Sequence, residues 1–127
     1  MNSLGIDIGT TGICGIIVDC ESGKILDSVN MNNDSFIKTD KEYERIQSPE
    51  RITEIVENIV KKLCNAETKA IGISNQMHGI LYADESGKAI SPLYTWQDAR
   101  GDLEYKDGKS YAERLGSFAG YGLVSDF

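Results

Sequence analysis

A short stretch near the N-terminus has the residue types that bind phosphate. Residues 7–12 read Asp-Ile-Gly-Thr-Thr-Gly and lie between two apolar runs, which predicts a strand, a tight turn and a second strand. We expect Gly9 and Gly12 to adopt positive φ, so that the backbone can approach a ligand closely. Backbone N–H groups and the hydroxyls of Thr10 and Thr11 can donate hydrogen bonds to phosphate oxygens.

Asp7 places a negative charge beside these donors. A carboxylate repels a phosphate unless a cation lies between them, so we expect a magnesium phosphate with Mg²⁺ held by Asp7 directly or through water. The alternative is an ordinary hairpin in which the aspartate, threonine and glycine residues serve only the turn. The motif alone leaves both interpretations open, because short glycine motifs give false positives.

Two polar clusters further along the chain could bind sugar hydroxyls. Gln76 and His78, the only histidine, follow a short apolar run, and amide and imidazole groups make directional hydrogen bonds. Trp96 lies beside Gln97 and Asp98, and an indole face with amide and acidic neighbours is a common way to hold a sugar. The alternative for the first cluster is that its side chains satisfy nearby backbone groups. For the second cluster, the alternative is a core tryptophan followed by a helix-capping aspartate.

The rest of the pattern predicts the elements that position these residues. Residues 25–29 extend the hairpin to a three-stranded meander, residues 30–47 form a polar loop, and residues 69–74 form a short buried strand. Ser48 and Pro49 begin the clearest helix, over residues 48–64, as an N-cap and a first-turn proline. Its apolar stripe is expected to pack on the sheet and consists of Ile52, Ile55, Val56, Ile59, Val60 and Leu63.

This order of elements indicates an α/β fold. Three antiparallel strands, a helix and a strand parallel to the first make a mixed sheet of about five strands with flanking helices. Ligands gather at the carboxyl ends of parallel strands, so the turn after Ile8 and the segment after Ser74 should face one another.

Length and composition narrow the classes of function. The chain has 127 residues, which suits one domain. Its 13 Lys+Arg and 20 Asp+Glu give a net charge of −7 without a basic stripe, which argues against a nucleic-acid or anionic-membrane partner. Cys14, Cys20 and Cys64 lack metal or redox spacing and are interpreted as reduced packing residues. With no long apolar span or basic leader, the sequence predicts a cytoplasmic protein.

Three separated motifs together resemble the N-terminal domain of the FGGY family of carbohydrate kinases. They are residues 5–11 (Gly-Ile-Asp-Ile-Gly-Thr-Thr), 76–79 (Gln-Met-His-Gly) and 95–100 (Thr-Trp-Gln-Asp-Ala-Arg). The second motif is similar to xylulokinases and sedoheptulokinases, and the third is more similar to sedoheptulokinases. The resemblance covers essentially the whole chain.

The resemblance implies an RNase H-like domain of the actin and hexokinase superfamily, one of two domains that close over ATP, Mg²⁺ and a ketose. It assigns the phosphate and metal loop, by position, to Asp7, Gly9, Thr10 and Thr11. It assigns sugar contacts to Gln76, Met77, His78, Trp96 and Asp98. It assigns no catalytic base to residues 1–127, because the family's catalytic aspartate and adenine-binding domain lie beyond this length.

Two departures from the family pattern shape the functional hypothesis. Most relatives carry Lys or Arg shortly after the Gly-Thr-Thr turn, where this chain has Cys14, so a cation that would neutralise the transferring phosphoryl group is missing or supplied elsewhere. Members of the family are also several times longer. We therefore expect the sugar-side part of an ATP-dependent ketose kinase that is inactive alone, with an exposed face that favours a homodimer. The alternative is a non-catalytic sugar-binding or regulatory module.

Overall fold

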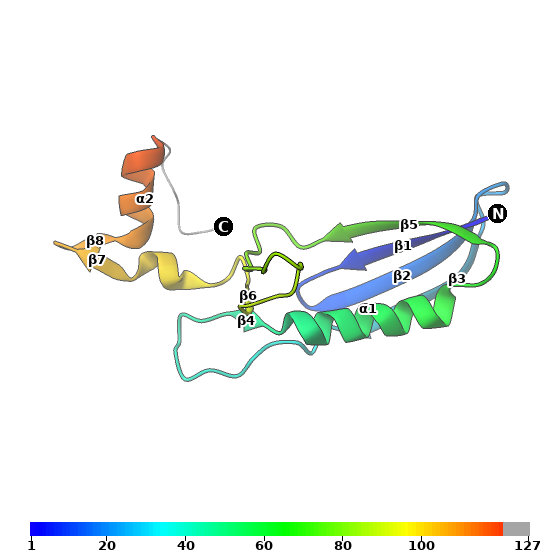
Figure 1. Ribbon diagram of the computed structural model, residues 1–127, viewed down its shortest axis with the longest axis horizontal. Helices are drawn as coiled ribbons and strands as arrows, with labels where there is room; N and C mark the ends of the chain where they lie inside the picture. Colours follow the sequence, from blue (N-terminus) through cyan, green and yellow to red (C-terminus); the bar gives the residue numbers. More distant parts are fainter. Residues whose placement is uncertain (121–127) are drawn as a thin grey trace. The chain divides into compact units, whose positions relative to one another are not determined.

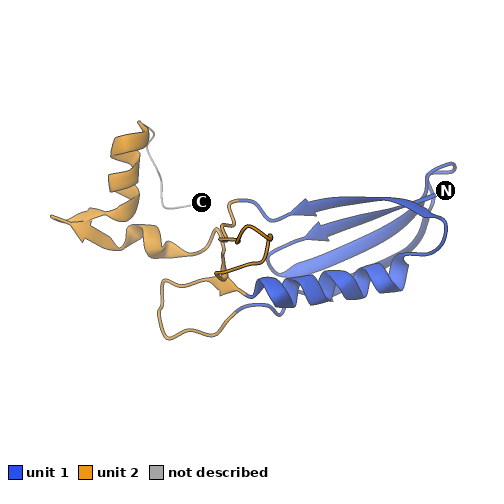
Figure 2. Cartoon of the chain, viewed as in Figure 1, with its two compact units in different colours: residues 1–36, 48–77 blue, residues 37–47, 78–127 orange. Residues whose placement is uncertain are grey.

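The computed structural model describes residues 1–120, and residues 121–127 lie outside the described part. The chain divides into two compact units (Figure 2). Unit 1 comprises residues 1–36 and 48–77, and unit 2 comprises residues 37–47 together with the described residues from 78 onward. The composition shows no shift that marks this division.

Unit 1 is built on a four-stranded mixed sheet (Figure 1). The strands are β1 (Asn2–Ile8), β2 (Gly12–Asp19), β3 (Ile25–Asn32) and β5 (Thr68–Asn75), in the order β3-β2-β1-β5. β1 pairs antiparallel with β2 and parallel with β5, and β2 pairs antiparallel with β3. The predicted hairpin, third strand and parallel crossover are confirmed. The sheet has four strands where about five were expected, and β3 runs three residues past its predicted end.

Helix α1 (Pro49–Leu63) covers one face of this sheet and forms the core with it. The Ser48 hydroxyl oxygen accepts a hydrogen bond from the backbone N–H of Arg51 at 3.1 Å, which confirms the predicted N-cap. The predicted stripe is also confirmed, because three of its residues are buried and three are half-buried. The buried core consists of Leu4, Ile6, Ile13, Ile17, Ile55, Ile59 and Leu63.

A glycine on β2 allows α1 to approach the sheet closely. A Cβ atom at Gly15 would lie 2.4 Å from Cγ2 of Ile59 and 3.0 Å from Cδ1 of Leu63. Any larger residue at this position would have to push the helix away or force its side chains into other rotamers. The close approach, and not an unusual backbone angle, explains the glycine.

Strand β5 is more exposed than the sequence predicts. Its residues were expected to be buried, but Ile71 is 50% exposed and Ile73 is 63% exposed. The reason is that β5 forms an edge of the described sheet, while α1 packs mainly over β2 and β3. An apolar run therefore identified the strand correctly, but not its burial.

Unit 2 contains short elements joined by turns. β4 (Ile46–Gln47) pairs antiparallel with β6 (Leu93–Tyr94), so the prediction of a loop over residues 30–47 is wrong at both ends. Ile80 extends this pairing through an antiparallel bridge to Tyr94. The elements that follow are η1 (Ala99–Asp102), β7 (Glu104–Lys106), β8 (Lys109–Ser110) and α2 (Tyr111–Ala119).

Two further expectations concern the state of the cysteines and the presence of a membrane-spanning helix. All three cysteines are free thiols, as predicted. Cys14 and Cys64 are half-buried, whereas Cys20 is exposed at the end of the β2 strand, so its interpretation as a packing residue is wrong. Within residues 1–120, no helix combines the length and the apolar character that a membrane crossing requires.

Candidate functional site

The turn between β1 and β2 is tight for a steric reason. The Gly9 backbone N–H donates to the Gly12 carbonyl at 2.9 Å, and a Cβ atom at Gly9 would lie 2.7 Å from that same carbonyl oxygen. Neither glycine has a positive φ, so that expectation is wrong. Gly9 is needed because the two ends of the turn come too close for a side chain at this position.

The 9–11 turn lies beside the segment that follows β5. The Thr10 hydroxyl donates to Oε1 of Gln76 at 2.8 Å, and the Gln76 backbone N–H donates to the carbonyl of Ile8 at 2.8 Å. The expectation that parallel strands bring these two segments together is therefore confirmed. A hydroxyl has a single proton to donate, so in this arrangement the Thr10 hydroxyl holds Gln76. Thr11 is the exposed hydroxyl of the turn.

A buried asparagine that the sequence analysis missed supports the turn from the end of β3. Asn33 is 6% exposed, its side-chain amide donates to the Gly9 carbonyl at 2.8 Å, and its backbone N–H donates to the Thr11 carbonyl at 2.9 Å. The side-chain Oδ1 of Asn33 accepts from the Ser35 hydroxyl at 2.5 Å. The signal in the sequence is the cluster of asparagines within residues 30–33, in the stretch predicted as a loop.

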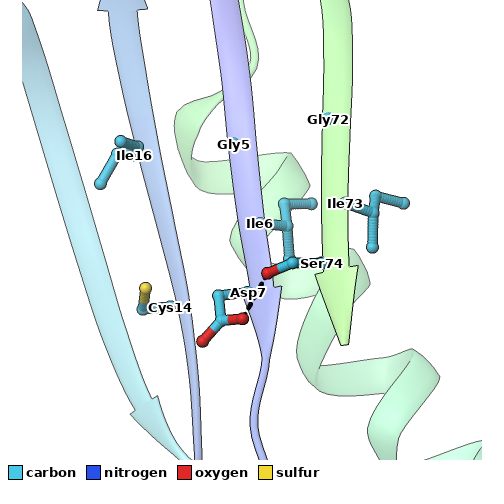
Figure 3. A pocket seen from close by; sticks show the side chains of 8 residues that line it. All are labelled: Gly5, Ile6, Asp7, Cys14, Ile16, Gly72, Ile73 and Ser74. Carbon is cyan, nitrogen blue, oxygen red and sulfur yellow. Dashed lines mark hydrogen bonds between the residues drawn. The ribbon is translucent and has the colours of Figure 1, made fainter. Parts of the chain in front are cut away.

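Asp7 lies on the sheet face opposite the core. In the strand register it is opposite Cys14 of β2 and Ser74 of β5, and its exposed carboxylate accepts a hydrogen bond from the Ser74 hydroxyl (Figure 3). Glycines at two neighbouring positions in the register keep this face open. The result is a cavity of about 430 Å³ lined by Gly5, Ile6, Asp7, Cys14, Ile16, Gly72, Ile73 and Ser74.

The donor set around Asp7 suits magnesium held together with a phosphate, and not a metal cage built by protein alone. Among the residues that the structure describes, no three His, Cys, Asp or Glu side chains lie together so that they could hold a metal ion. Mg²⁺ commonly takes one or two carboxylates and completes its shell with water and substrate phosphates. One exposed carboxylate next to a turn with phosphate-type donors fits that pattern. Cys14, across from Asp7, contributes no cation.

The second motif is exposed and contains an unusual backbone conformation. Met77 is 74% exposed, and His78 is exposed with φ of 57°. Few residues other than glycine adopt this left-handed region, and such residues concentrate at functional sites.

Within unit 2, the bridge between Ile80 and Tyr94 relates the histidine to the tryptophan. His78 lies two residues before Ile80, and Trp96 lies two residues after Tyr94. Because the bridge is antiparallel, both residues lie beyond the same end of it. Each Cα is within about 7 Å of the Cα of its own bridge residue, since two residues of chain reach no further.

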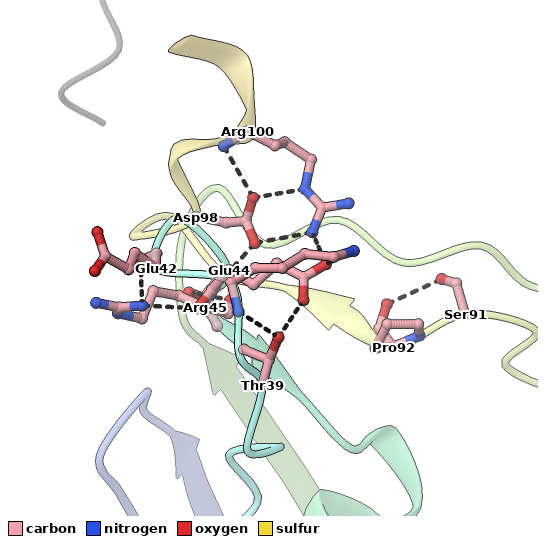
Figure 4. Close-up of polar contacts among 10 residues, drawn as sticks. Thr39, Glu42, Glu44, Arg45, Ser91, Pro92, Asp98 and Arg100 are labelled. Atoms are coloured by element: carbon pink, nitrogen blue, oxygen red, sulfur yellow. Dashed lines mark hydrogen bonds and ion pairs between the residues drawn. The ribbon is translucent and has the colours of Figure 1, made fainter. Parts of the chain in front are cut away.

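The structure tests the alternative interpretation of the third motif, a core tryptophan followed by a capping aspartate. Trp96 is 45% exposed, so the alternative of a core tryptophan is wrong. The alternative of a helix cap for Asp98 is confirmed, because its Oδ1 atom accepts from the backbone N–H of Arg100 at the start of η1. Its Oδ2 atom accepts from the backbone N–H of Arg45 at 2.9 Å (Figure 4).

The Asp98 carboxyl is held in its charged form by its neighbours. Its burial alone would raise its pKa, but hydrogen bonds from the Arg100 side chain and from the backbone N–H groups of Arg45 and Arg100 outweigh that effect and lower the pKa. The Arg100 guanidinium donates to the carboxylate through Nε at 2.5 Å and through Nη2 at 3.0 Å.

Each unit therefore collects one part of the predicted site. Unit 1 brings together Asp7, the 9–11 turn and Gln76, and unit 2 contains His78, Trp96 and Asp98. The convergence of Asp7, His78 and Asp98 on one cleft stays a prediction.

Comparisons with known proteins agree with the three motifs. Residues 2–113 match the N-terminal domain of the FGGY family of carbohydrate kinases. A xylulose kinase from Staphylococcus xylosus is 30% identical over 110 residues, which are 84% of this chain and 22% of that protein. A gluconokinase from Bacillus subtilis (strain 168) is 29% identical over 103 residues, which are 78% of this chain and 20% of that protein.

A solved structure shows the same fold. Ligand-bound xylulose kinase from Lactobacillus acidophilus matches with a TM-score of 0.74 and 24% sequence identity, over 94% of this chain and 23% of that chain. The predicted mixed α/β fold is thereby confirmed. The chain spans between 20% and 23% of the length of these three proteins.

Proposed function

Because the chain belongs to the FGGY family of carbohydrate kinases, we propose that it forms the sugar- and phosphate-binding part of an ATP-dependent kinase that phosphorylates a ketose. The observation that carries the proposal is the hydrogen bond from Thr10 to Gln76, which joins the phosphate-type turn to the start of the second motif. The substrate is a ketose of the xylulose or sedoheptulose type. The similarity to proteins named xylulose kinase supports this class of substrate.

The 9–11 turn binds the phosphates in this proposal. The backbone N–H and the exposed hydroxyl of Thr11 donate to phosphate oxygens, whereas the Gly9 N–H already donates to the Gly12 carbonyl. Asp7 would hold Mg²⁺ beside them, and the bound ion would supply the positive charge that neutralises the ATP phosphates. The Ser74 hydroxyl fixes the orientation of the Asp7 carboxylate. The base that deprotonates the attacking hydroxyl is expected outside residues 1–127.

The second and third motifs bind the sugar. His78 acts through hydrogen bonds and not as a general base, since no carboxylate adjacent in sequence orients it. The Trp96 indole stacks on sugar C–H groups, and Gln76 and Met77 contact the ketose. Asp98 completes this part of the site by holding the third motif in place through its hydrogen bonds to the backbone N–H groups of Arg45 and Arg100.

The test is the rate of ADP release with a ketose, ATP and Mg²⁺, measured on a full-length protein that carries this chain. Asp7→Ala should lower kcat, because the metal is misplaced in the transition state. Asp98→Ala should weaken ketose binding by roughly 2–4 kcal/mol, and His78→Ala should act in the same direction but more mildly. Asp40→Ala, a change at an exposed carboxylate of unit 2, is the matched control and should leave both constants unchanged.

The same assay separates the kinase from a non-catalytic sugar-binding or regulatory module. A full-length protein that binds the ketose without releasing ADP would support the module. The 127-residue chain alone should not turn over ATP with any ketose, because it carries only part of the phosphoryl-transfer apparatus. Steady metal-dependent ADP release from the chain alone would contradict the proposal that part of the phosphoryl-transfer apparatus lies outside residues 1–127.

A further inference from the structure

The third motif forms a β-turn whose two central residues point into solvent. The Asp98 backbone N–H donates to the Thr95 carbonyl at 3.0 Å, and the Gln97 backbone N–H donates to the Thr95 hydroxyl at 3.3 Å. Trp96 and Gln97 occupy the central positions, and both are exposed, whereas Thr95 is 4% exposed. The turn thus exposes the Trp96 indole and the Gln97 amide, while Thr95 at its start is buried.

Both ends of the 95–98 turn are fastened to a second segment of unit 2. The backbone N–H and the hydroxyl of Thr95 both donate to the Arg45 carbonyl, at 3.0 and 2.8 Å. At the other end, the Arg45 backbone N–H donates to Asp98 and the Ala99 backbone N–H donates to the Tyr43 carbonyl at 2.9 Å. Four hydrogen bonds therefore fix the turn before any ligand arrives.

The Asp98 carboxylate has no acceptor capacity left for a sugar hydroxyl. Its two oxygens accept from the backbone N–H of Arg45 and from the backbone N–H, Nε and Nη2 of Arg100. A carboxylate offers about four lone-pair sites, so these four donors occupy all of them. Its side chain is only 3% exposed.

Arg100 is in turn held from two sides. Its guanidinium lies 4.0 Å from the centre of the Tyr94 ring. Its Nη2 atom lies 3.5 Å from Oε1 of Glu44 (Figure 4). The other oxygen of Glu44 accepts from the Thr39 hydroxyl at 2.6 Å, and the Glu44 side chain is 14% exposed. Asp98, Arg100, Glu44 and Thr39 form what we call the Asp98 network.

We propose that Trp96 and Gln97 are the groups of this turn that contact the sugar, and that Asp98, Arg100 and Glu44 are positioning residues that set the geometry of the turn. This inference rests on the proposed function. An indole face takes sugar C–H groups, and a neighbouring amide both donates to and accepts from hydroxyls. Fixing the two groups in advance lowers the entropy lost when the ligand binds.

The test compares ketose kinetics of single variants in the full-length protein. Gln97→Ala should raise the KM for the ketose about tenfold, as expected for one lost hydrogen-bonding group, with the KM for ATP unchanged. Arg100→Lys keeps the charge but removes the planar fork, and it should raise the same KM by a similar factor. Glu44→Gln should raise it by a smaller factor. Glu42→Gln, in the same segment but outside the Asp98 network, should match the native protein.

A second measurement reports on the turn without any sugar. Trp96 is the only tryptophan of the chain, so its indole N–H gives a single NMR signal. In the 127-residue chain without sugar, Arg100→Lys and Glu44→Gln should shift this signal, while Glu42→Gln should not.

The outcomes separate this inference from the proposed function. A native full-length protein without ketose-dependent ADP release would overturn both. Native activity, with the ketose KM unchanged in Gln97→Ala, Arg100→Lys and Glu44→Gln, would overturn only the inference. So would variants that raise the KM for ketose and for ATP equally, since that pattern indicates a general loss of structure. If Arg100→Lys fails to fold, the near-isosteric Glu44→Gln decides.

Discussion

Different forces fix the candidate binding turn in each of the two units of the chain. In unit 1, the 9–11 turn joins two strands of a sheet whose buried core consists of seven aliphatic side chains. In the described part of unit 2, the buried residues are Ile46, Gln47 and Thr95, and two of these three are polar. The 95–98 turn is therefore fixed by hydrogen bonds and ion pairs. An apolar core is sensitive to lost volume, whereas a polar network is sensitive to pH and to the geometry of its donors.

The largest effect should come from opening a cavity in unit 1. Ile59→Ala removes a fully buried side chain and should lower the free energy of unfolding by about 2–4 kcal/mol. Ile71→Ala, the same change at a position that is 50% exposed, is the control and should cost less than about 1 kcal/mol. Urea denaturation followed by circular dichroism at 222 nm measures both. Equal effects would mean that the core of unit 1 does not depend on α1.

A smaller effect is expected from overfilling the same core. Gly15→Ala would place a Cβ atom 2.4 Å from Ile59, and the repacking should cost about 1–3 kcal/mol. Gly72→Ala is the matched control, because it adds the same methyl group to a strand position with no heavy atom within 4 Å. The two denaturation midpoints give the comparison. A neutral Gly15→Ala would show that α1 can move off β2 at little cost.

The polar network of unit 2 should respond to acid. Because the folded-state pKa of Asp98 is lowered, its contribution to stability is present above the unfolded value of about 3.9 and is lost as pH falls through the folded value. Fluorescence of Trp96 should therefore report a transition of unit 2 below about pH 4. Asp98→Asn should weaken the turn at neutral pH and remove this part of the transition. The same acid response in Asp98→Asn would refute the assignment to Asp98.

The smallest effect is expected for ion pairs on the surface of unit 1. The Arg51 guanidinium contacts Asp34 and Glu54, and all three side chains are largely exposed. Surface ion pairs contribute little because solvent screens them. Arg51→Gln should therefore leave the unfolding midpoint unchanged within error. A clearly lower unfolding midpoint would show that ion pairs also stabilise unit 1. The two units would then differ less in the forces that hold them.

Sequence patterns predicted the parts of the fold that depend on local periodicity. Spacings of three and four residues located the α1 stripe, and its members Ile55 and Ile59 are fully buried. Burial of β5 could not be predicted in the same way, because it depends on what covers the strand and not on the strand itself. The predicted positive φ of Gly9 was wrong for a related reason. A glycine can be required either by a positive φ or by the close approach of other atoms, and the sequence alone does not distinguish the two.

The candidate site was predicted as a set of residues but not as a set of contacts. The Thr10 to Gln76 contact followed from the rule that parallel strands end at one edge of a sheet. The contact between Asp98 and the Arg45 backbone, 53 residues apart, has no such rule behind it. The support of the 9–11 turn by Asn33 was missed likewise, because a buried asparagine and a loop asparagine look the same in sequence.

The parallel pairing of β1 with β5 has a consequence for synthesis on the ribosome. β1 ends at Ile8, but its parallel partner starts at Thr68 and is complete only at Asn75. Translation at about 5–20 residues per second covers that stretch in roughly 3 to 15 seconds. During this interval β2, β3 and α1 can assemble, while the other edge of β1 has unpaired backbone groups. The nascent chain thus presents an open strand edge to chaperones and to neighbouring chains until β5 emerges and pairs with it.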